Sequence, residues 1–421
     1  MMLALFLKEC ATIGKSIIYL VFVCAIVLFY ATQMGEETME IIKPQEGEES
    51  YGYRYDGGKS EKVMPEIVSF LAINWKDNHY TAYNFIGIGR HVELSPEKQA
   101  EIAQIIYEIT GVGAEELYEP VMEALAENEY AYRMDIDFSG IVPIRIAYDE
   151  FKEKMKRIDK ILGGSYGESH FKSHGAAMRT YEEALADYNA LVYDDMTTGA
   201  YARLFCDYMG IAAALLSVFV PVAFLMRDRR AKANDVIFSR SMASAKFIVA
   251  RYAAAVAMMT APFLLLSLAP TIYLAKFALG NGLPVDMFAF AKYSLAWILP
   301  TLMTTAAVAF VITTATDSPL AIALQFAWSL IDLICGSVIA YDVTGNLIHY
   351  GMSLIIRHND VGYLQYYKDN LAQLAINRVF YAALSIALVA LSIFIYDRKR
   401  RGEIDVRGSL RKIFGNRKSA D

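Results

Sequence analysis

The sequence predicts an all-α polytopic membrane protein, with six transmembrane helices and an extracellular domain that is mostly helical with minor β structure. Of its 421 residues, 55% are hydrophobic and 20% are charged, which is more apolar and less charged than a typical soluble domain. Six apolar runs of roughly 18 residues or more are long enough to cross a bilayer as helices. They cover approximately Ser16–Gln33, Leu204–Met226, Phe247–Leu274, Tyr293–Thr316, Pro319–Ala340 and Arg378–Tyr396.

The charged residues are sorted between these runs, and this predicts the topology. Residues 34–203 contain 32 acids and 17 bases, a net charge of −15. The loop Arg227–Lys246 has six bases and two acids, and the segment after Tyr396 has nine bases and four acids. Six spans place both termini on the side of the basic loop, and basic loops favour the cytoplasm. We therefore expect both termini in the cytoplasm and the acidic region outside.

Residues 1–33 are expected to form an interfacial helix and the first transmembrane helix. The apolar positions before Lys8 and Lys15 suit a short helix at the headgroup layer, or a frayed extension of the span. No small-residue cleavage site follows the first apolar run, so we interpret it as a retained span and not as a removable signal peptide.

The compartment is expected to be a bacterial plasma membrane. All four cysteines lie in or beside apolar runs, so no disulfide framework holds the outside region together. The chain also has no Asn-x-Ser/Thr sequence for N-glycosylation.

Residues 34–203 form the predicted extracellular domain. Ser95 as N-cap and Pro96 at the first helical position begin a helix that ends at Gly111. A similar helix ends at Gly163, and between the two, residues 132–148 alternate apolar and polar around a Ser-Gly turn, which predicts a small hairpin. The first helix carries a single apolar stripe of Ile102, Ile105, Ile106 and Ile109.

Residues 204–396 contain spans two to six, with the basic loop near residues 227–246 and an outer loop at 341–377; a basic cytoplasmic tail follows at 397–421. The basic loop combines charge with a short apolar helix, which charge sorting alone does not require. Its charged cluster comprises Arg227, Asp228, Arg229 and Arg230. A helical segment and turn follow, with Asp235, Val236, Ile237, Phe238, Ser239, Arg240 and Ser244, and Arg251 lies near the start of the third span.

This order of residues resembles the cytoplasmic loop of the type-2 exporter class of ATP-binding-cassette (ABC) permeases. The resemblance covers the membrane part: an amphipathic start, a first span with a large outside insertion, five further spans and a last span ending in "YDRKRRG". The extracellular domain resembles no family we can name. The loop departs from the common pattern at Ala231–Ala233, where Gly-Thr is frequent, and at Ser241, where proline is frequent.

The resemblance implies a permease subunit that couples ATP hydrolysis by a separate ATPase to outward movement of an unknown substrate. The chain has no phosphate-binding G-x-x-x-x-G-K-[ST] motif, so we expect no cofactor and no enzyme activity here, with ATP and Mg on the partner. The expected partners are a cytosolic ABC ATPase, a second permease chain in a homodimer or heterodimer, and membrane lipids, but no nucleic acid. Residues Arg227–Arg240 are expected to couple to the ATPase.

Two alternatives stay open. The basic loop is otherwise a simple positive-inside anchor, and the protein is otherwise a membrane-anchored receptor or scaffold whose outside domain binds a ligand without transport.

His170 and His174 lie one helical turn apart, but without a third ligand we expect a solvated helix face and not a metal site.

The fifth span carries three polar residues on one helical face, Gln325, Ser329 and Asp332. An acid at membrane depth is unfavourable unless it is paired or hydrated. This face therefore lines a pathway or subunit seam, or Asp332 pairs with a base such as Arg378.

Overall fold

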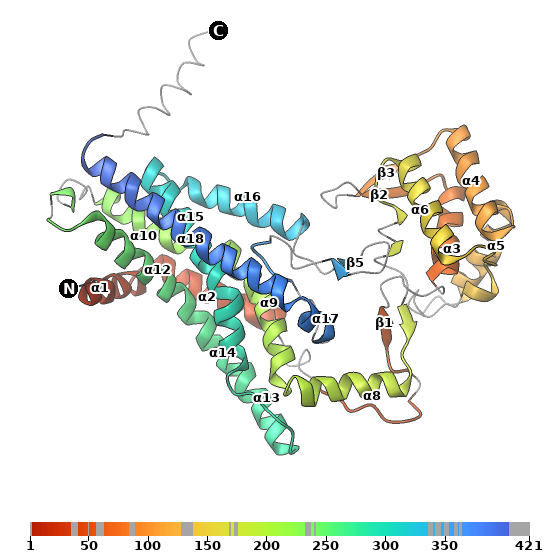
Figure 1. Cartoon of the computed structure of the whole chain (residues 1–421), viewed down its shortest axis with the longest axis horizontal. Helices are drawn as coiled ribbons and strands as arrows, with labels where there is room; N and C mark the ends of the chain where they lie inside the picture. Colours follow the sequence, from red (N-terminus) through yellow and green to blue (C-terminus); the bar gives the residue numbers. More distant parts are fainter. Residues whose placement is uncertain are drawn as a thin grey trace, which may run out of the picture. The chain divides into compact units, whose positions relative to one another are not determined.

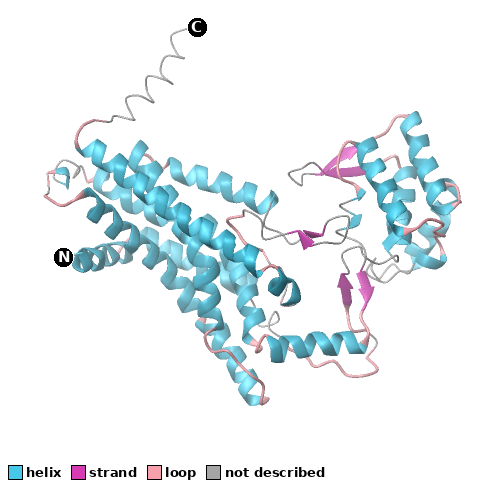
Figure 2. Ribbon diagram, in the orientation of Figure 1, coloured by secondary structure: helices cyan, strands magenta, loops and turns pink. Residues whose placement is uncertain are grey.

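A computed structural model describes residues 2–34, 41–48, 50–55, 63–83, 89–127, 138–167, 170–171, 176–231, 237–239, 241–335, 340–341, 347–348, 353–357, 361 and 364–403. In these ranges the chain is mainly α-helical, with short antiparallel strand pairs (Figure 2). It divides into two compact units. The membrane unit comprises Met1–Ile41, Asn189–Val338 and Tyr350–Asp421, and the insertion unit comprises Ile42–Tyr188 and Ile339–His349.

The membrane unit is a bundle in which α15 packs along α18, and α12 packs against both (Figure 1). Its helices are α1 (Met2–Gly14), α2 (Ile17–Gln33), α9 (Thr198–Leu216), α10 (Phe219–Arg230), α12 (Ser244–Leu266), α13 (Leu268–Gly280), α14 (Ala289–Tyr293), α15 (Leu299–Thr316), α16 (Leu320–Cys335), α17 (Leu364–Asp369) and α18 (Leu371–Arg400). Two π-helical turns, η4 (Ala190–Asp194) and η5 (Ser294–Ile298), precede α9 and α15.

Among the described residues, four continuous helices are long and apolar enough to cross a membrane. They are Thr198–Arg230, Ser244–Gly280, Ala289–Thr316 and Leu371–Arg400. The pair α1 and α2 would be a fifth span if it crosses as one bent unit, and the apolar part of α16, Leu320–Leu333, is shorter. The chain is therefore a mostly helical protein with several helices suited to crossing a membrane, and a total of six spans stays a prediction.

A bend of 70° separates α1 from α2. Ser16 lies at the bend with an extended backbone, and its Oγ accepts a hydrogen bond of 3.3 Å from the backbone N–H of Ile18. A capping serine of this kind begins a new helix. The short segment before the first span is thus a separate helix, which packs against α12, and not a frayed extension of α2.

The insertion unit is a small helical fold around one apolar core. Its helices are α3 (Val63–Lys76), α4 (Pro96–Thr110), α5 (Ala114–Glu127), the 3₁₀ turn η3 (Phe138–Gly140), α6 (Tyr148–Leu162) and α8 (Tyr181–Asn189). Its strand pairs are β1 (Tyr53–Tyr55) with β4 (Ala176–Met178), β2 (Tyr80–Tyr83) with β3 (Gly89–Val92), and β5 (Ala340–Tyr341) with β6 (Leu347–Ile348).

The two predicted helices of this unit are confirmed. Helix α4 begins at Pro96 after Ser95, although the Ser95 side chain makes no capping hydrogen bond. Gly111 and Gly163 end α4 and α6 with left-handed backbones, φ 72° and 68°, a conformation that glycine adopts without strain. The four isoleucines of the predicted stripe, Ile102, Ile105, Ile106 and Ile109, are fully buried.

The predicted hairpin at residues 132–148 is wrong for its described part. Residues 138–140 form a 3₁₀ turn, and residues 141–147 form no strand. The Phe138 carbonyl accepts the N–H groups of Ile141 and Val142, and the side chains of Phe138 and Val142 are buried. Tertiary burial therefore selects a compact turn over an extended pair. A short hairpin forms elsewhere in this unit, between β2 and β3.

His170 makes the stability of the insertion unit dependent on pH. Its ring centroid lies 4.0 Å from that of Tyr166, and burial lowers the pKa of the imidazole below its ordinary value of 6.5. The unfolded chain then binds a proton at higher pH than the folded chain, so the free energy of unfolding decreases as pH falls through 6.5. Hydrogen bonds from lysines lower the pKa values of Glu108 and Glu153 below the ordinary value of 4.5. These two carboxylates therefore change the stability of the unit only at pH values below about 4.5.

We expect hydrogen exchange of α3 and α6 peptides in the full chain to accelerate relative to the intrinsic rate between about pH 7 and about pH 5. His170→Gln should flatten this dependence. An unchanged slope in the variant would show that another group is responsible.

Candidate functional site

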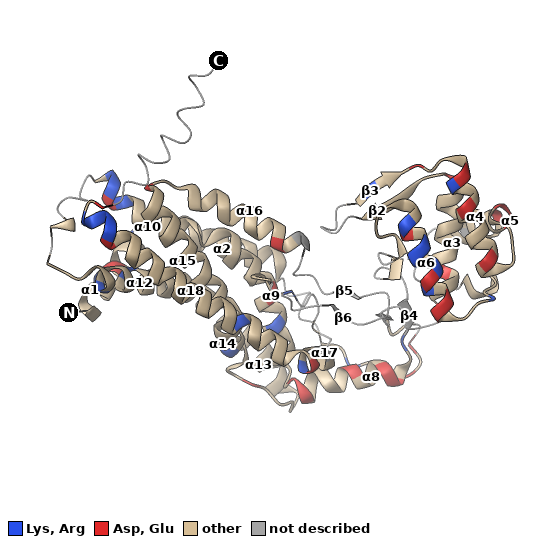
Figure 3. Ribbon diagram, turned by 45° about the horizontal axis from the view of Figure 1, so that its top comes forward, with Lys and Arg blue, Asp and Glu red and all other residues tan. Residues whose placement is uncertain are grey.

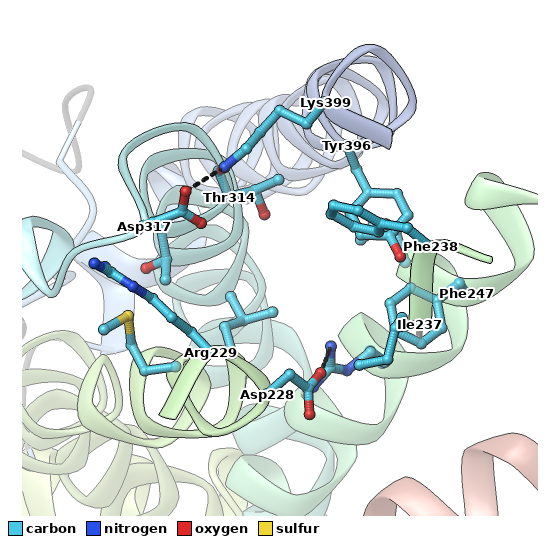
Figure 4. A pocket seen from close by; sticks show the side chains of 14 residues that line it. Asp228, Arg229, Ile237, Phe238, Phe247, Thr314, Asp317, Tyr396 and Lys399 are labelled. Carbon is cyan, nitrogen blue, oxygen red and sulfur yellow. Dashed lines mark hydrogen bonds and ion pairs between the residues drawn. The ribbon is translucent and has the colours of Figure 1, made fainter. Parts of the chain in front are cut away.

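Four helix ends and the described part of the basic loop enclose a cavity of about 220 Å³, which we call the helix-end cavity (Figure 4). The last turns of α10, α15 and α18 and the first turns of α12 supply its walls, together with Ile237 and Phe238 of the loop. Figure 4 shows aromatic side chains on one side and charged side chains on the other. The predicted coupling segment is therefore part of a structured site.

An ion pair joins the end of α10 to the start of α12. Arg251 Nη1 lies 2.8 Å from Asp228 Oδ2, and the Arg251 side chain is 4% exposed. Its guanidinium stacks on two rings, 4.3 Å from the centroid of Phe224 and 5.0 Å from that of Phe247. A planar guanidinium is suited to this combination of pairing and stacking. The predicted cluster residue Asp228 and the predicted basic residue of the third span thus meet directly.

Two basic residues of α18 tie this helix to α15 and to the loop. Lys399 Nζ lies 2.6 Å from Asp317 Oδ2 and donates to the carbonyl of Thr314 at 2.8 Å. Arg400 donates to the carbonyls of Phe238 at 2.8 Å and Met242 at 2.7 Å. These bonds join residues about 80 and about 160 positions apart in the chain.

The apolar edge of the loop packs against the chain itself. The ring of Phe238 meets Tyr396 of α18 edge to face, with centroids 5.5 Å apart, and Phe247 packs on the same tyrosine at 5.3 Å. Ile237 and Phe238 are half-buried. This edge is therefore partly covered, because Tyr396 lies against it.

Some of the other predicted coupling residues are described by the structure and some are not. Arg227 is half-exposed and lies 3.4 Å from Asp228 and 3.8 Å from Glu9 of α1. Arg229 lines the cavity, while Arg230 is exposed. Ser239 is exposed and Ser244 donates to Asp397 at 2.8 Å. The predicted residues Asp235, Val236 and Arg240 lie outside the described residues.

The site also contains residues that the sequence analysis missed. Asp317, Tyr396, Lys399 and Arg400 were not singled out, although the run of bases after Tyr396 was visible as the end of the last span. Nothing local in the sequence pairs that run with a loop about 160 residues earlier. The buried Glu9 of α1 was missed for the same reason.

The predicted polar face of α16 points into the bundle. Gln325 and Ser329 are fully buried. The Gln325 amide donates to the carbonyl of Ala214 on α9 at 3.2 Å and to Thr305 on α15 at 3.4 Å. These contacts occur within one chain, so they support an internal packing role for these two residues over a subunit seam.

Asp332 binds a buried non-helical segment and not a neighbouring base. Its carboxylate accepts the backbone N–H groups of Leu354 at 3.2 Å and Ile355 at 2.8 Å, and the Ser353 hydroxyl at 2.9 Å. Arg378 donates to the carbonyls of Ser353 at 2.8 Å and Leu354 at 3.2 Å. Among the described residues, no direct ion pair joins Asp332 to Arg378. Instead of pairing with each other, both side chains form hydrogen bonds with the segment 353–355.

Two further buried ion pairs lie at the start of α9. Arg203 contacts Asp195 with two bonds of 2.7 and 2.6 Å, and its side chain is 0% exposed. Arg357 Nε lies 2.5 Å from Asp207, which is also fully buried. Asp207 lies inside a predicted span, so the rule that selected Asp332 would have found it too.

No group of three or more histidine, cysteine, aspartate or glutamate side chains arranged for a metal ion occurs among the described residues. His170 lies near Tyr166, and His174 is outside the described residues. Comparison with protein families, with curated proteins and with solved structures finds no match for this chain. Function is therefore inferred from the geometry of the chain itself.

Proposed function

We propose that this chain is the membrane-spanning permease subunit of an ABC exporter in a bacterial plasma membrane. It has six spans, both termini in the cytoplasm and residues 34–203 outside, and it pairs with a second permease chain. A separate cytosolic ATPase binds ATP and Mg and drives outward movement of the substrate. The loop Arg227–Lys246 is the contact with that ATPase.

The observation that carries the proposal is the attachment of the loop to several helices at once. Arg400 holds the carbonyls of Phe238 and Met242 to the end of α18. The pair of Asp228 with Arg251 holds α10 to α12. A partner that displaces the loop would therefore shift three long helices together, which is the rigid-body motion that such coupling requires.

The charge of the helix ends supports an acidic partner surface. Lys and Arg side chains gather at the last turns of α10 and α18 (Figure 3). Arg230 and Arg398 are exposed there. Complementary charge guides and orients protein association, so we expect an acidic rim on the ATPase around the seat of Phe238.

Co-purification tests this proposal. The full chain, expressed with any ABC ATPase found in its gene neighbourhood, is expected to retain that ATPase through affinity purification. Phe238→Asp should reduce recovery by about tenfold or more, because a charge at the apolar edge disfavours a desolvated contact. The matched control is Phe288→Asp. Phe288 is exposed and lies just before α14, whereas the cavity lies at the other end of the α14–α15 helix, at the last turns of α15.

Recovery must be compared in preparations with the same melting temperature. Equal recovery of the ATPase with both variants would contradict the coupling role of the loop. A genome neighbourhood without any ABC ATPase, together with a ligand bound by the outside domain, would favour the receptor or scaffold alternative.

A further inference from the structure

We propose that the helix-end cavity binds the phosphate of an anionic phospholipid. The cavity measures about 220 Å³ and lies where the apolar parts of α10 and α18 give way to charged last turns. In a helix that crosses a bilayer, this transition lies at the headgroup layer. The site is thus at the depth where a lipid phosphate is found.

Two buried polar atoms in the cavity walls indicate a missing partner. Thr313 is 3% exposed and Arg251 is 4% exposed, and both line the cavity. Thr313 Oγ1 and Arg251 Nε have no hydrogen-bond partner among the described residues. Buried polar groups are almost always paired. Arg251 Nε can only donate a hydrogen bond and the Thr313 hydroxyl can also donate, so an acceptor of hydrogen bonds is the group that would satisfy both.

The balance of charge favours an anionic acceptor. Among the described residues, the carboxylates that line the cavity are those of Asp228 and Asp317, and each is paired, with Arg251 at 2.8 Å and with Lys399 at 2.6 Å. Arg229 also lines the cavity, and among the described residues it makes no ion pair or hydrogen bond. The described lining residues therefore carry one positive charge beyond their internal pairs. Guanidinium groups bind phosphate oxygens strongly.

The apolar side of the cavity favours a lipid over a free anion. Ile237, Phe238, Phe247 and Tyr396 form one wall (Figure 4). This wall suits the glycerol and the first acyl carbons, while the charged side receives the phosphate. Basic pockets between membrane helices commonly bind anionic headgroups in this way. The inference does not depend on the presence of an ATPase.

Lipid titration of the full purified chain in a neutral detergent tests the inference. Dioleoylphosphatidylglycerol is expected to bind at one tight site, seen by native mass spectrometry, and to raise the melting temperature. Dioleoylphosphatidylcholine should bind at least about tenfold more weakly, because it has no net charge to offer Arg229. Inorganic phosphate should give no comparable rise.

Three variants make the test specific. Arg229→Gln should weaken phosphatidylglycerol binding about tenfold, and the nearly isosteric Thr313→Val about threefold, as expected for one charged and one neutral hydrogen bond. Arg230→Gln is the control, because Arg230 is next to Arg229 in the sequence but its exposed side chain does not line the cavity. Equal losses for the two arginine variants, equal binding of both lipids, or equal protection by inorganic phosphate would each overturn the proposal.

Discussion

Arg378→Ala is expected to destabilise the membrane unit by about 3–5 kcal/mol, the usual effect of removing one partner from a buried charged network. The side chain is 6% exposed and donates to the backbone of the segment 353–354 and to Thr301 of α15. Its loss removes one donor from each of the buried carbonyl oxygens of Ser353 and Leu354, which keep only Asn377 and Thr301 as donors among the described residues. It also removes the cation that binds the same segment as the Asp332 carboxylate. Thermal unfolding in detergent should show a melting temperature lower by about 10 °C.

The control for this experiment is Arg398→Ala on the same helix. Arg398 is exposed and pairs with Glu403, and such surface pairs contribute less than about 1 kcal/mol. Similar melting temperatures for the two variants would show that the grip on the segment 353–355 does not stabilise the bundle.

Arg251→Ala is expected to have the largest effect at the helix-end cavity, again about 3–5 kcal/mol. The substitution leaves Asp228, whose side chain is 14% exposed, without its close cation and removes the guanidinium that stacks on Phe224 and Phe247. Hydrogen exchange in peptides from the end of α10 and the start of α12 should accelerate strongly. Peptides of the insertion unit should not change.

Arg227→Ala serves as the comparison, because Arg227 is 45% exposed and its two acidic neighbours lie at 3.4 and 3.8 Å. We expect a change below about 1 kcal/mol. If Arg227→Ala accelerated exchange as much as Arg251→Ala, general charge at this end of the bundle, and not the specific pair with Asp228, would be responsible.

Much of the local structure was predictable because it depends on short stretches of sequence. The apolar runs, the helix start at Pro96 and the glycine stops at Gly111 and Gly163 follow from propensity, capping and hydrophobic periodicity. The hairpin predicted at residues 132–148 is wrong because the alternating pattern carries no information about the packing of Phe138 and Val142, which selects a compact turn. Pattern alone does not distinguish an edge strand from a turn held by its buried side chains.

About half of the residues of the candidate site could be predicted from the sequence. The charged cluster and the apolar residues of the loop stand next to one another in the sequence, so their grouping needed no fold. The other half, Asp317, Tyr396, Lys399 and Arg400, comes from helices far along the chain. Their meeting depends on how α15 and α18 pack, which no local pattern encodes.

The sequence by itself determined that this is a helical chain with long apolar helices and strongly sorted charge, because segment length and hydrophobicity act locally. Only the tertiary structure decided which charges pair with one another: Asp228 with Arg251, and Asp317 with Lys399. It also decided that Asp332 accepts the backbone N–H groups of Leu354 and Ile355. The physical reason is that an ion pair or a hydrogen bond is effective only over a few ångströms. Packing sets such distances between residues that are remote in the sequence.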